Sequence, residues 1–255
     1  MAIRTTTRTT TNPVFYGDEL RALLADDPER LERILTEPDS VDLLTWNVFA
    51  SLDTHSDRDF LAYRMQAFGG ASVRAPVRLS LFTGKDRGPE LRPSDDYLDA
   101  VRERILAAGG SEAALDAFDD PIEVPVRVES PDVLILIETA LRTPPVGTAG
   151  RDRLLELVDA GLEQARRLDS ALAIGVVYEA GTPAATQLSA RIATLSDPAR
   201  LAAELAHRDT VPPVTFREMT WQRLLSIWDA ERSWLDLAGQ PVRGFVGHTR
   251  RLGLR

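Results

Sequence analysis

Apolar residues recur along the chain in two periods, one typical of helices and the other typical of strands. Helical spacing follows Asp39 or Ser40 and again follows Ser94, and these residue types are favoured helix N-caps. Strict alternation marks residues 76–83, whereas the unbroken apolar run at 171–178 is typical of a strand with both faces buried. The pattern predicts helices at 27–36, 40–52, 94–108, 151–168, 184–195, 198–207 and from 220 onward, and strands at 76–83, 122–128, 133–141 and 171–178.

The order of these elements predicts the fold class. Helices come first, then three strands, with the helix at 94–108 between the first and the second, then a helix and a strand, and then helices again. This order fits an α/β protein with a mixed sheet, a central hairpin and helices on both faces. No internal repeat and no long Pro/Gly/Ser linker interrupts it, so we expect one domain at 13–240, a disordered arm at 1–12 and a basic tail at 241–255.

The strands at 122–128 and 133–141 are the best-defined local prediction. A tight turn at Ser130-Pro131 would place Glu123 directly opposite Glu138 and gather the valines and isoleucines of both strands on one face. A shift by one residue would mix the two faces, which supports this register. Two facing carboxylates are unfavourable unless a cation or a shared proton lies between them.

The composition is that of an ordinary globular protein, with 255 residues of which 44% are hydrophobic and 27% charged. The chain has no cysteine, which excludes disulfides, thiolate metal sites and a cysteine nucleophile, and which fits a cytoplasmic protein. No apolar stretch reaches the roughly 18 residues that a membrane span needs. The arm at 1–12, with Arg4 and Arg8 among threonines, lacks the apolar segment of a secretory signal.

The charge distribution bears on partners. The net charge is −9, so no overall field attracts nucleic acid and any such contact needs a local basic patch. The C-terminal tail is the candidate patch for binding nucleic acid. The alternative interpretation is that this tail is simply a solvated end of the chain. Its basic residues are Arg243, Arg250, Arg251 and Arg255.

Two segments of the chain resemble the PD-(D/E)XK nuclease superfamily. Residues 44–49 (Leu-Thr-Trp-Asn-Val-Phe) are similar to a helical string of that family, and Thr220-Trp221 before the last helix also recurs in such proteins. The family hairpin reads Pro-x-Glu-Val-Asp, a short turn and Ile-Glu-x-Lys. Here residues 121–125 read Pro-Ile-Glu-Val-Pro and residues 137–140 read Ile-Glu-Thr-Ala. The resemblance runs from about residue 37 to 230 and implies a restriction-endonuclease-like fold.

The resemblance also implies a site. In the family, the hairpin Asp and Glu hold one or two Mg²⁺ ions and the Lys positions or activates water, because hard dications bind carboxylate oxygens and lower the pKa of bound water. At the matching positions this chain has Pro125 and Ala140, and the family's Glu before the Trp string falls on Val41, beside Asp42. The resemblance therefore implies a degenerate site, in which Glu138, with Glu123 nearby, would bind Mg²⁺ weakly.

The pair of glutamates leaves three interpretations open. It is a rearranged site with residual metal-dependent cleavage, a metal or phosphate site without catalysis, or a solvated end of the sheet. Arg142 shares a face with Glu138 and is a further vestigial candidate, but its guanidinium stays protonated and cannot act as a base. Lys85, the only lysine, lies in a polar loop far from the hairpin in sequence.

Other chemistries find little support in the sequence. The three histidines are scattered and predicted to lie at the surface, the four tryptophans are predicted to pack in the core, and neither a P-loop nor a Gly-x-Ser-x-Gly elbow is present. The leading hypothesis is a nuclease-like domain that acts by binding a protein partner or nucleic acid, with the net acidity favouring protein. The alternatives are an active Mg²⁺-dependent deoxyribonuclease in defence or DNA repair, and a structural or assembly subunit.

Overall fold

The computed structural model describes residues 11–55, 57–109, 121–142 and 152–255. Contacts between Cα atoms divide the chain into two compact units. We call Met1–Thr54 together with Leu225–Arg255 the helical unit, and His55–Leu224 the sheet unit. The predicted arm at 1–12 lies outside the described residues except for residues 11 and 12, and the predicted boundary at residue 240 falls inside the helical unit.

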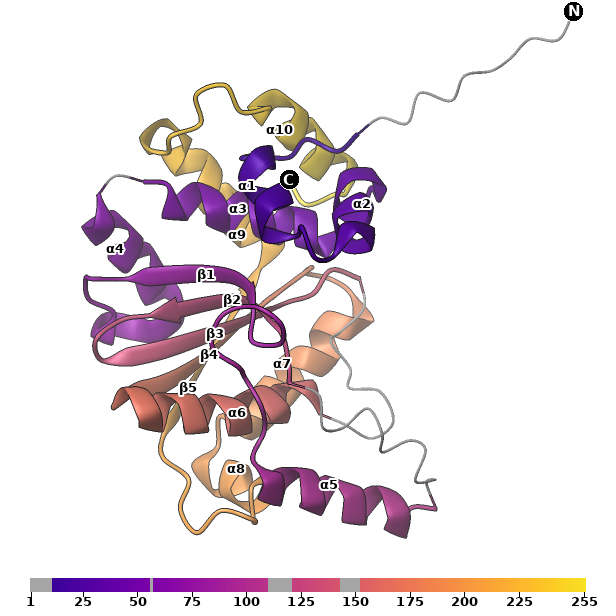
Figure 1. Cartoon of the computed structure of the whole chain (residues 1–255), viewed down its shortest axis with the longest axis vertical. Helices are drawn as coiled ribbons and strands as arrows, with labels where there is room; N and C mark the ends of the chain where they lie inside the picture. The colour runs from indigo at the N-terminus through magenta and orange to yellow at the C-terminus, as the bar shows by residue number, and fades with distance from the viewer. Residues whose placement is uncertain (1–10, 56, 110–120, 143–151) are drawn as a thin grey trace, which may run out of the picture. The chain divides into compact units, whose positions relative to one another are not determined.

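The sheet unit contains one open mixed sheet of five strands (Figure 1). The strands follow one another in chain order across the sheet, antiparallel from β1 to β3 and parallel from β3 to β5. The prediction of a central β2–β3 hairpin in a mixed sheet is therefore confirmed, whereas β5 escaped prediction because its sequence mixes polar and apolar residues. The strands are β1 (Arg78–Thr83), β2 (Val124–Glu129), β3 (Val133–Thr139), β4 (Ala171–Tyr178) and β5 (Val214–Thr220).

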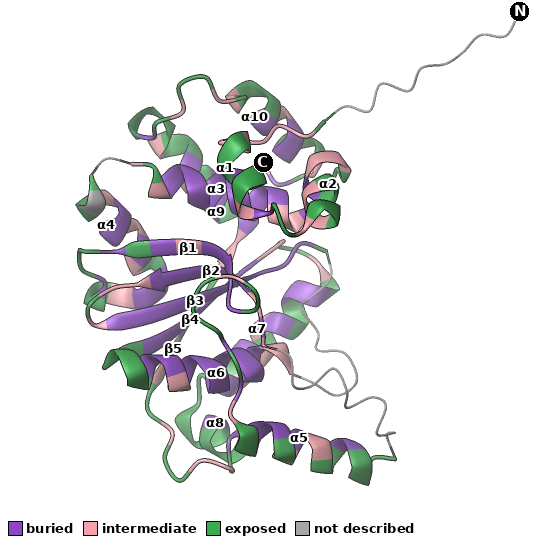
Figure 2. Cartoon of the chain, in the orientation of Figure 1, coloured by how far each residue is buried: buried purple, intermediate pink, exposed green. Residues whose placement is uncertain are grey.

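Helices cover both faces of the sheet, as predicted. A Cβ on Gly175 of β4 would lie 2.7 Å from Phe68 of α4, and a Cβ on Gly161 of α6 would lie 2.9 Å from Leu172, so both helices pack closely on the strands. The apolar core on this face also includes residues of α5, α7 and α8, and α6 is a largely buried helix (Figure 2). The helices of this unit are α4 (Arg58–Gly69), η1 (Gly70–Ser72), α5 (Asp95–Ala107), α6 (Arg153–Leu168), α7 (Pro183–Leu195) and α8 (Pro198–Glu204).

The helical unit is made of residues from both ends of the chain. Of the two residues predicted to cap α3, Ser40 and not Asp39 is the cap. Asp27 caps α2, and Thr220 accepts a hydrogen bond from the amide of Arg223 at the start of α9. The helices are α1 (Gly17–Leu23), α2 (Pro28–Thr36), α3 (Val41–Asp53), η4 (Arg232–Trp234) and α10 (Val242–Arg251), with α9 (Trp221–Glu231) continuing into this unit from the sheet unit.

Residues 44–49, the string that carries part of the family resemblance, have a structural role in α3. The indole of Trp46 donates a hydrogen bond to the carbonyl of Phe15 at 2.6 Å. The amide of Asn47 accepts from the backbone N–H of Phe15 and donates to the carbonyl of Pro13, both at 2.8 Å. Because Trp46 and Asn47 are buried, these bonds fasten the N-terminal segment to the core of the helical unit.

The C-terminal segment is folded, in contrast to the solvated end that the sequence suggested. Residues 242–251 form α10, and Phe245 and His248 on this helix are buried. Beyond the helix, Arg255 pairs with Asp229 and lies 5.6 Å from the ring centroid of Trp228. Arg255 is therefore a packing residue of the helical unit.

The β2–β3 register differs from the predicted register by two residues. Val126 pairs with Ile137 and Val128 pairs with Ile135. Continuing this register places Pro125 opposite Glu138, so the prediction that Glu123 faces Glu138 is wrong. A shift by two keeps each side chain on its face, and the hydrophobic pattern therefore cannot detect it. The turn is also wider than predicted, since the amide of Ser130 bonds to the carbonyl of Val133 at 3.1 Å.

The absence of cysteine from the natural sequence allows a direct test of this register. Directly opposed residues of an antiparallel pair have Cα atoms about 4.5–5.5 Å apart, within the range that a disulfide spans. We expect Val128→Cys with Ile135→Cys to form a disulfide on oxidation, measured by non-reducing electrophoresis and mass spectrometry. The matched control, Val128→Cys with Val133→Cys, tests the rejected register. Crosslinking in the control alone would contradict the observed pairing.

Candidate functional site

The candidate site lies where β3 ends and α6 begins. Glu138 is the penultimate residue of β3 and is only 5% exposed. One of its carboxylate oxygens accepts from the backbone N–H of Thr139 at 3.3 Å. Glu138 lies on the same sheet face as Leu136, the face that α6 covers, which explains its burial. A buried carboxylate at this position needs a partner that neutralises its charge.

That partner is Arg153, the first residue of α6. Its Nε donates to Oε2 of Glu138 at 2.8 Å, and its Nη2 donates to the main-chain carbonyl oxygen of Glu123. The side chain of Arg153 is 19% exposed and that of Glu138 is 7% exposed. One guanidinium thus joins the end of β3, the segment before β2 and the start of α6. Arg153 was not among the predicted site residues, although its place at the first turn of the predicted helix after Glu138 was a usable signal.

Glu123 has its own arginine. Oε2 of Glu123 lies 3.5 Å from Nη1 of Arg87, which belongs to the loop after β1. This loop reaches the hairpin because β1 pairs with β2, so the loop is near in space although far in sequence. Gly84 allows the approach, since it has φ +116° and a Cβ there would lie 2.5 Å from the carbonyl oxygen of Ile122.

The remaining candidates at the hairpin take other places. Arg142 is exposed and lies beyond the end of β3, and Lys85 is exposed in the same loop as Arg87. Ala140 is buried, and its carbonyl oxygen accepts from the indole of Trp221 at 2.8 Å. Asp42 belongs to the helical unit, where it pairs with Arg30 at 2.8 Å.

The residues of the hairpin do not fit a divalent cation as they are arranged. Glu138 already binds a guanidinium, the position opposite it carries an apolar proline, and Glu123 is paired with Arg87. Across the described ranges, no group of three or more His, Cys, Asp or Glu side chains is placed to hold a metal ion. The site is a charge-balanced cluster of two carboxylates and two guanidiniums, and its chemistry is that of a structural ion-pair network.

The three arginines proposed for nucleic-acid contact lie together on α10. Arg243, Arg250 and Arg251 are exposed, whereas Arg255 is paired as described above. The positions 243 and 250 are seven residues apart, so they lie on one side of the helix. The chain therefore has an exposed basic helix face at its C-terminus.

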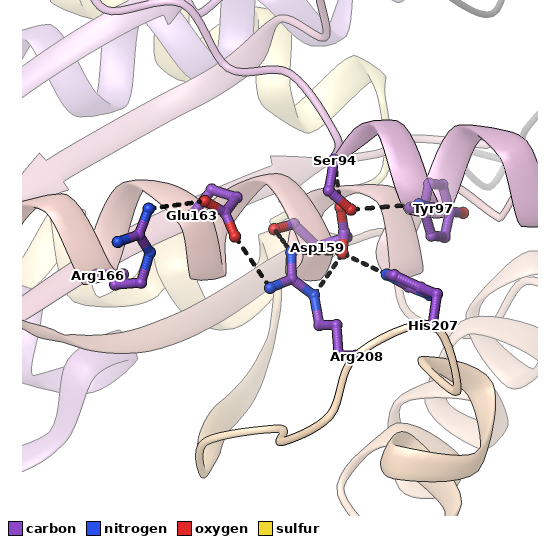
Figure 3. A network of polar contacts seen from close by, with 7 residues as sticks. All are labelled: Ser94, Tyr97, Asp159, Glu163, Arg166, His207 and Arg208. Carbon is purple, nitrogen blue, oxygen red and sulfur yellow. Dashed lines mark hydrogen bonds and ion pairs between the residues drawn. The ribbon is translucent and has the colours of Figure 1, made fainter.

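A second polar cluster, not foreseen from the sequence, is centred on Asp159 of α6 (Figure 3). This residue is fully buried and accepts from Arg208 at 2.6 Å, from the backbone N–H of Ser94 at 2.6 Å and from Nε2 of His207 at 2.9 Å. Burial alone would raise the pKa of Asp159, but these hydrogen bonds outweigh it and hold the pKa below its ordinary value. Glu163, one turn later, binds the same arginine at 3.1 Å. Asp159 thus ties α5, α6 and the segment after α8 together.

Two predictions about side-chain burial need correction. The histidines were expected at the surface, but the side chain of His207 is 8% exposed and His248 is 2% exposed. The tryptophans were expected in the core, and Trp234 is an exception at 67% exposed. In both cases the local sequence gave no sign of the neighbouring elements that decide burial.

Comparison with known proteins leaves the chain without an assigned family. No protein-family model, no curated protein and no solved structure matches it. Among the helices of the described residues, none has both the length and the apolar character required to cross a membrane. The fold itself is an α/β fold with a five-stranded mixed sheet.

Proposed function

We propose that this chain is a degenerate relative of the PD-(D/E)XK nucleases that acts by binding and no longer cleaves nucleic acid. The observation that carries the proposal is the state of Glu138, the carboxylate matched to the family's metal ligand. Glu138 is buried and bound by Arg153 at 2.8 Å, and the register places Pro125 opposite it. The sheet unit runs in the order β1, α5, β2, β3, α6, β4, α7, α8 and β5, and it contains the strand–strand–helix–strand succession expected from residue 122 onward.

The physical reason for lost cleavage is the loss of the residues that would hold a cation. Metal-assisted hydrolysis needs a cation that polarises the phosphate and lowers the pKa of water, and such a cation needs several oxygen ligands. Here the position of one ligand is proline, and the other ligand is neutralised by Arg153. Ala140 offers no ammonium group to orient water. Binding is then the function that remains for a fold of this kind.

A protein is the partner that we favour. The net charge of −9 opposes approach to a polyanion, so long-range attraction to nucleic acid is absent. Nucleic acid is the second candidate, and the exposed face of α10 with Arg243, Arg250 and Arg251 is the observation in its favour. A structural or assembly subunit is a special case of the first candidate, since it too acts through protein contacts.

The first test of the proposal is a cleavage assay. We expect the wild-type protein to leave plasmid, linear and single-stranded DNA intact in the presence of Mg²⁺ or Mn²⁺, because no metal-bound water forms at Glu138. Cleavage by the wild type that is abolished by Glu138→Ala would instead support the active deoxyribonuclease with a rearranged site. Cleavage that survives Glu138→Ala would refute the assignment of this hairpin as the site.

The second test separates the two partner classes. Fluorescence anisotropy with labelled DNA should show weak binding at physiological salt for the wild type. If nucleic acid is the partner, changing Arg243, Arg250 and Arg251 to Glu should abolish binding and reduce its salt dependence. The matched control changes three exposed arginines elsewhere to Glu, namely Arg21, Arg78 and Arg200. Equal losses in both triple variants would show that only net charge matters and would favour a protein partner.

A further inference from the structure

A cavity of about 690 Å³ lies within the sheet unit, and its walls come from α5, α7, α8 and the segment after α8. Sites for small molecules usually measure about 300–1,000 Å³ and combine apolar walls with a few polar groups. The apolar part of this wall consists of alanines, whose short side chains leave the space open. They are Ala100 and Ala107 of α5, Ala203 of α8 and Ala206 after α8.

The Asp159 cluster fixes one part of the cavity wall. His207 lines the cavity with a side chain that is 8% exposed, and its Nε2 is held by Asp159 at 2.9 Å. Ala107 and Ala203 are exposed, so the cavity opens to solvent beside them. The cavity is therefore rigid at its buried part and accessible from solution, as sites for small ligands are.

The acid that lines the cavity from α8 already has a partner. Glu204 accepts from Nη1 of Arg191 at 2.6 Å. This hydrogen bond is the main cause that holds the pKa of Glu204 below its ordinary value, and the charge of Arg104 adds to it. The other acid of the described lining is Glu103, which is exposed, so solvent screens its charge. Neither acid therefore favours a cationic ligand.

Two arginines, one on α5 and one on α8, have hydrogen-bond donors left for a ligand. Within the described residues, Arg104 donates through Nε to the carbonyl of Ala100 at 3.3 Å, and its two Nη groups remain available. Arg200 lies 3.8 Å from Asp197, and because the two side chains are 67% and 50% exposed, respectively, this pair is weak. A guanidinium stays charged and binds two oxygens of a carboxylate or phosphate side by side.

We infer that this cavity binds a small organic anion, in which a carboxylate, phosphate or sulfonate group is attached to an apolar body. Arg104 and Arg200 bind the anionic group, and the alanine walls and the ring of His207 contact the apolar body. The described lining contains neither Glu138 nor its partners, so this site and the proposed loss of cleavage are tested independently.

The test compares two probes that differ in charge, dansyl sulfonate and its neutral analogue dansyl amide. Equilibrium dialysis should show that the full chain binds one dansyl sulfonate with a dissociation constant on the order of 100 µM, as expected for an organic ligand of this size. Dansyl amide should bind at least about fivefold more weakly, because it offers the guanidiniums no charge. Equal affinity for the two probes would overturn the assignment to an anion. No saturable binding of dansyl sulfonate below about 1 mM would overturn the site itself.

Two substitutions locate the ligand. Ala203→Phe should fill the cavity and abolish binding, and the exposure of position 203 allows the larger side chain without unfolding. Arg104→Gln should weaken the binding of dansyl sulfonate about fivefold or more and leave the binding of dansyl amide unchanged. Near-ultraviolet circular dichroism confirms that each variant is folded. If Ala203→Phe does not fold, Ala107→Phe at the other exposed alanine carries the same test.

The matched control is Arg166→Gln, which makes the same change in net charge on α6 at an arginine that is 73% exposed and does not line the cavity. It should leave the affinity for both probes unchanged. Equal losses in Arg104→Gln and Arg166→Gln would mean that net charge alone attracts the anion, and binding that survives Ala203→Phe would place the ligand elsewhere. Either result would overturn the inference.

Discussion

Replacing Asp159 with alanine is expected to lower the free energy of unfolding by about 3–5 kcal/mol, the usual cost of breaking a buried ion pair from one side. Asp159 is fully buried and accepts from Arg208, His207 and the backbone N–H of Ser94. Without the carboxylate, the guanidinium of Arg208 stays in a site where it is only 15% exposed. Urea unfolding followed by circular dichroism measures the loss.

Glu163 provides the matched control for this prediction. It binds the same arginine, but its side chain is 26% exposed and solvent screens the pair. Glu163→Gln should therefore cost about 1 kcal/mol or less. Equal losses in the Asp159 and Glu163 variants would mean that burial does not set the strength of this cluster. Changing Asp159 and Arg208 together to apolar residues should cost less than the sum of the single changes, because neither charge is then left alone.

The Asp159 cluster also shows where sequence reasoning stops. The apolar residues of α6 predicted the helix correctly. A single pattern does not reveal that α5, α7 and α8 share one apolar core with α6. The partners of Asp159 are Ser94 and Arg208, far along the chain in both directions. Whether these residues come together depends on how α5, α6 and the segment after α8 pack, and the spacing of apolar residues within one element does not encode that packing.

The hairpin shows a different limit. Alternation along β2 and β3 correctly predicted the strands and which residues share a face, because side chains point to opposite faces in turn. Registers that differ by two residues bury the same side chains, so the pattern leaves them equivalent. The width of the turn decides between them, and here Ser130 and Asp132 in the turn are held by Arg74. That residue lies before β1, outside the hairpin altogether.

At the candidate site, the sequence pattern failed for both of these reasons. Opposed glutamates at positions 123 and 138 were expected to need a cation, and the cations found are arginines. The two glutamates do not face each other, so the geometry behind that expectation was wrong, and each carboxylate is paired with a separate arginine. Arg87 and Arg153 reach the hairpin through strand pairing and helix placement. The candidate arginine taken from the strand pattern, Arg142, is exposed beyond the end of β3.

The second large effect is expected in the response of the helical unit to acid. His248 on α10 is 2% exposed, and its Nε2 makes no hydrogen bond within the described residues. Burial, reinforced by the charge of Arg251, outweighs a hydrogen bond to the carbonyl of Pro38 and lowers the pKa of His248 below 6.5. The folded protein therefore prefers the neutral imidazole, whereas the unfolded chain takes up a proton near its ordinary pKa.

The sign of the effect follows from this order of pKa values. The contribution of His248 to stability is complete above pH 6.5 and falls as the pH drops below that value, until the lowered pKa of the folded state is reached. Within that pH window, the free energy of unfolding should fall by up to about 1.4 kcal/mol per pH unit. The test is urea unfolding between pH 7.5 and about pH 5, a range above that in which ordinary carboxylates titrate. The free energy of unfolding of the wild type should fall with pH in this range. The fall should be absent in His248→Asn, which keeps an amide donor for Pro38. His55→Asn is the control, because it removes an imidazole from the sheet unit, where His55 stacks on Phe60, and keeps His248 in place. A wild-type slope that persists in His248→Asn would assign the acid response to another group.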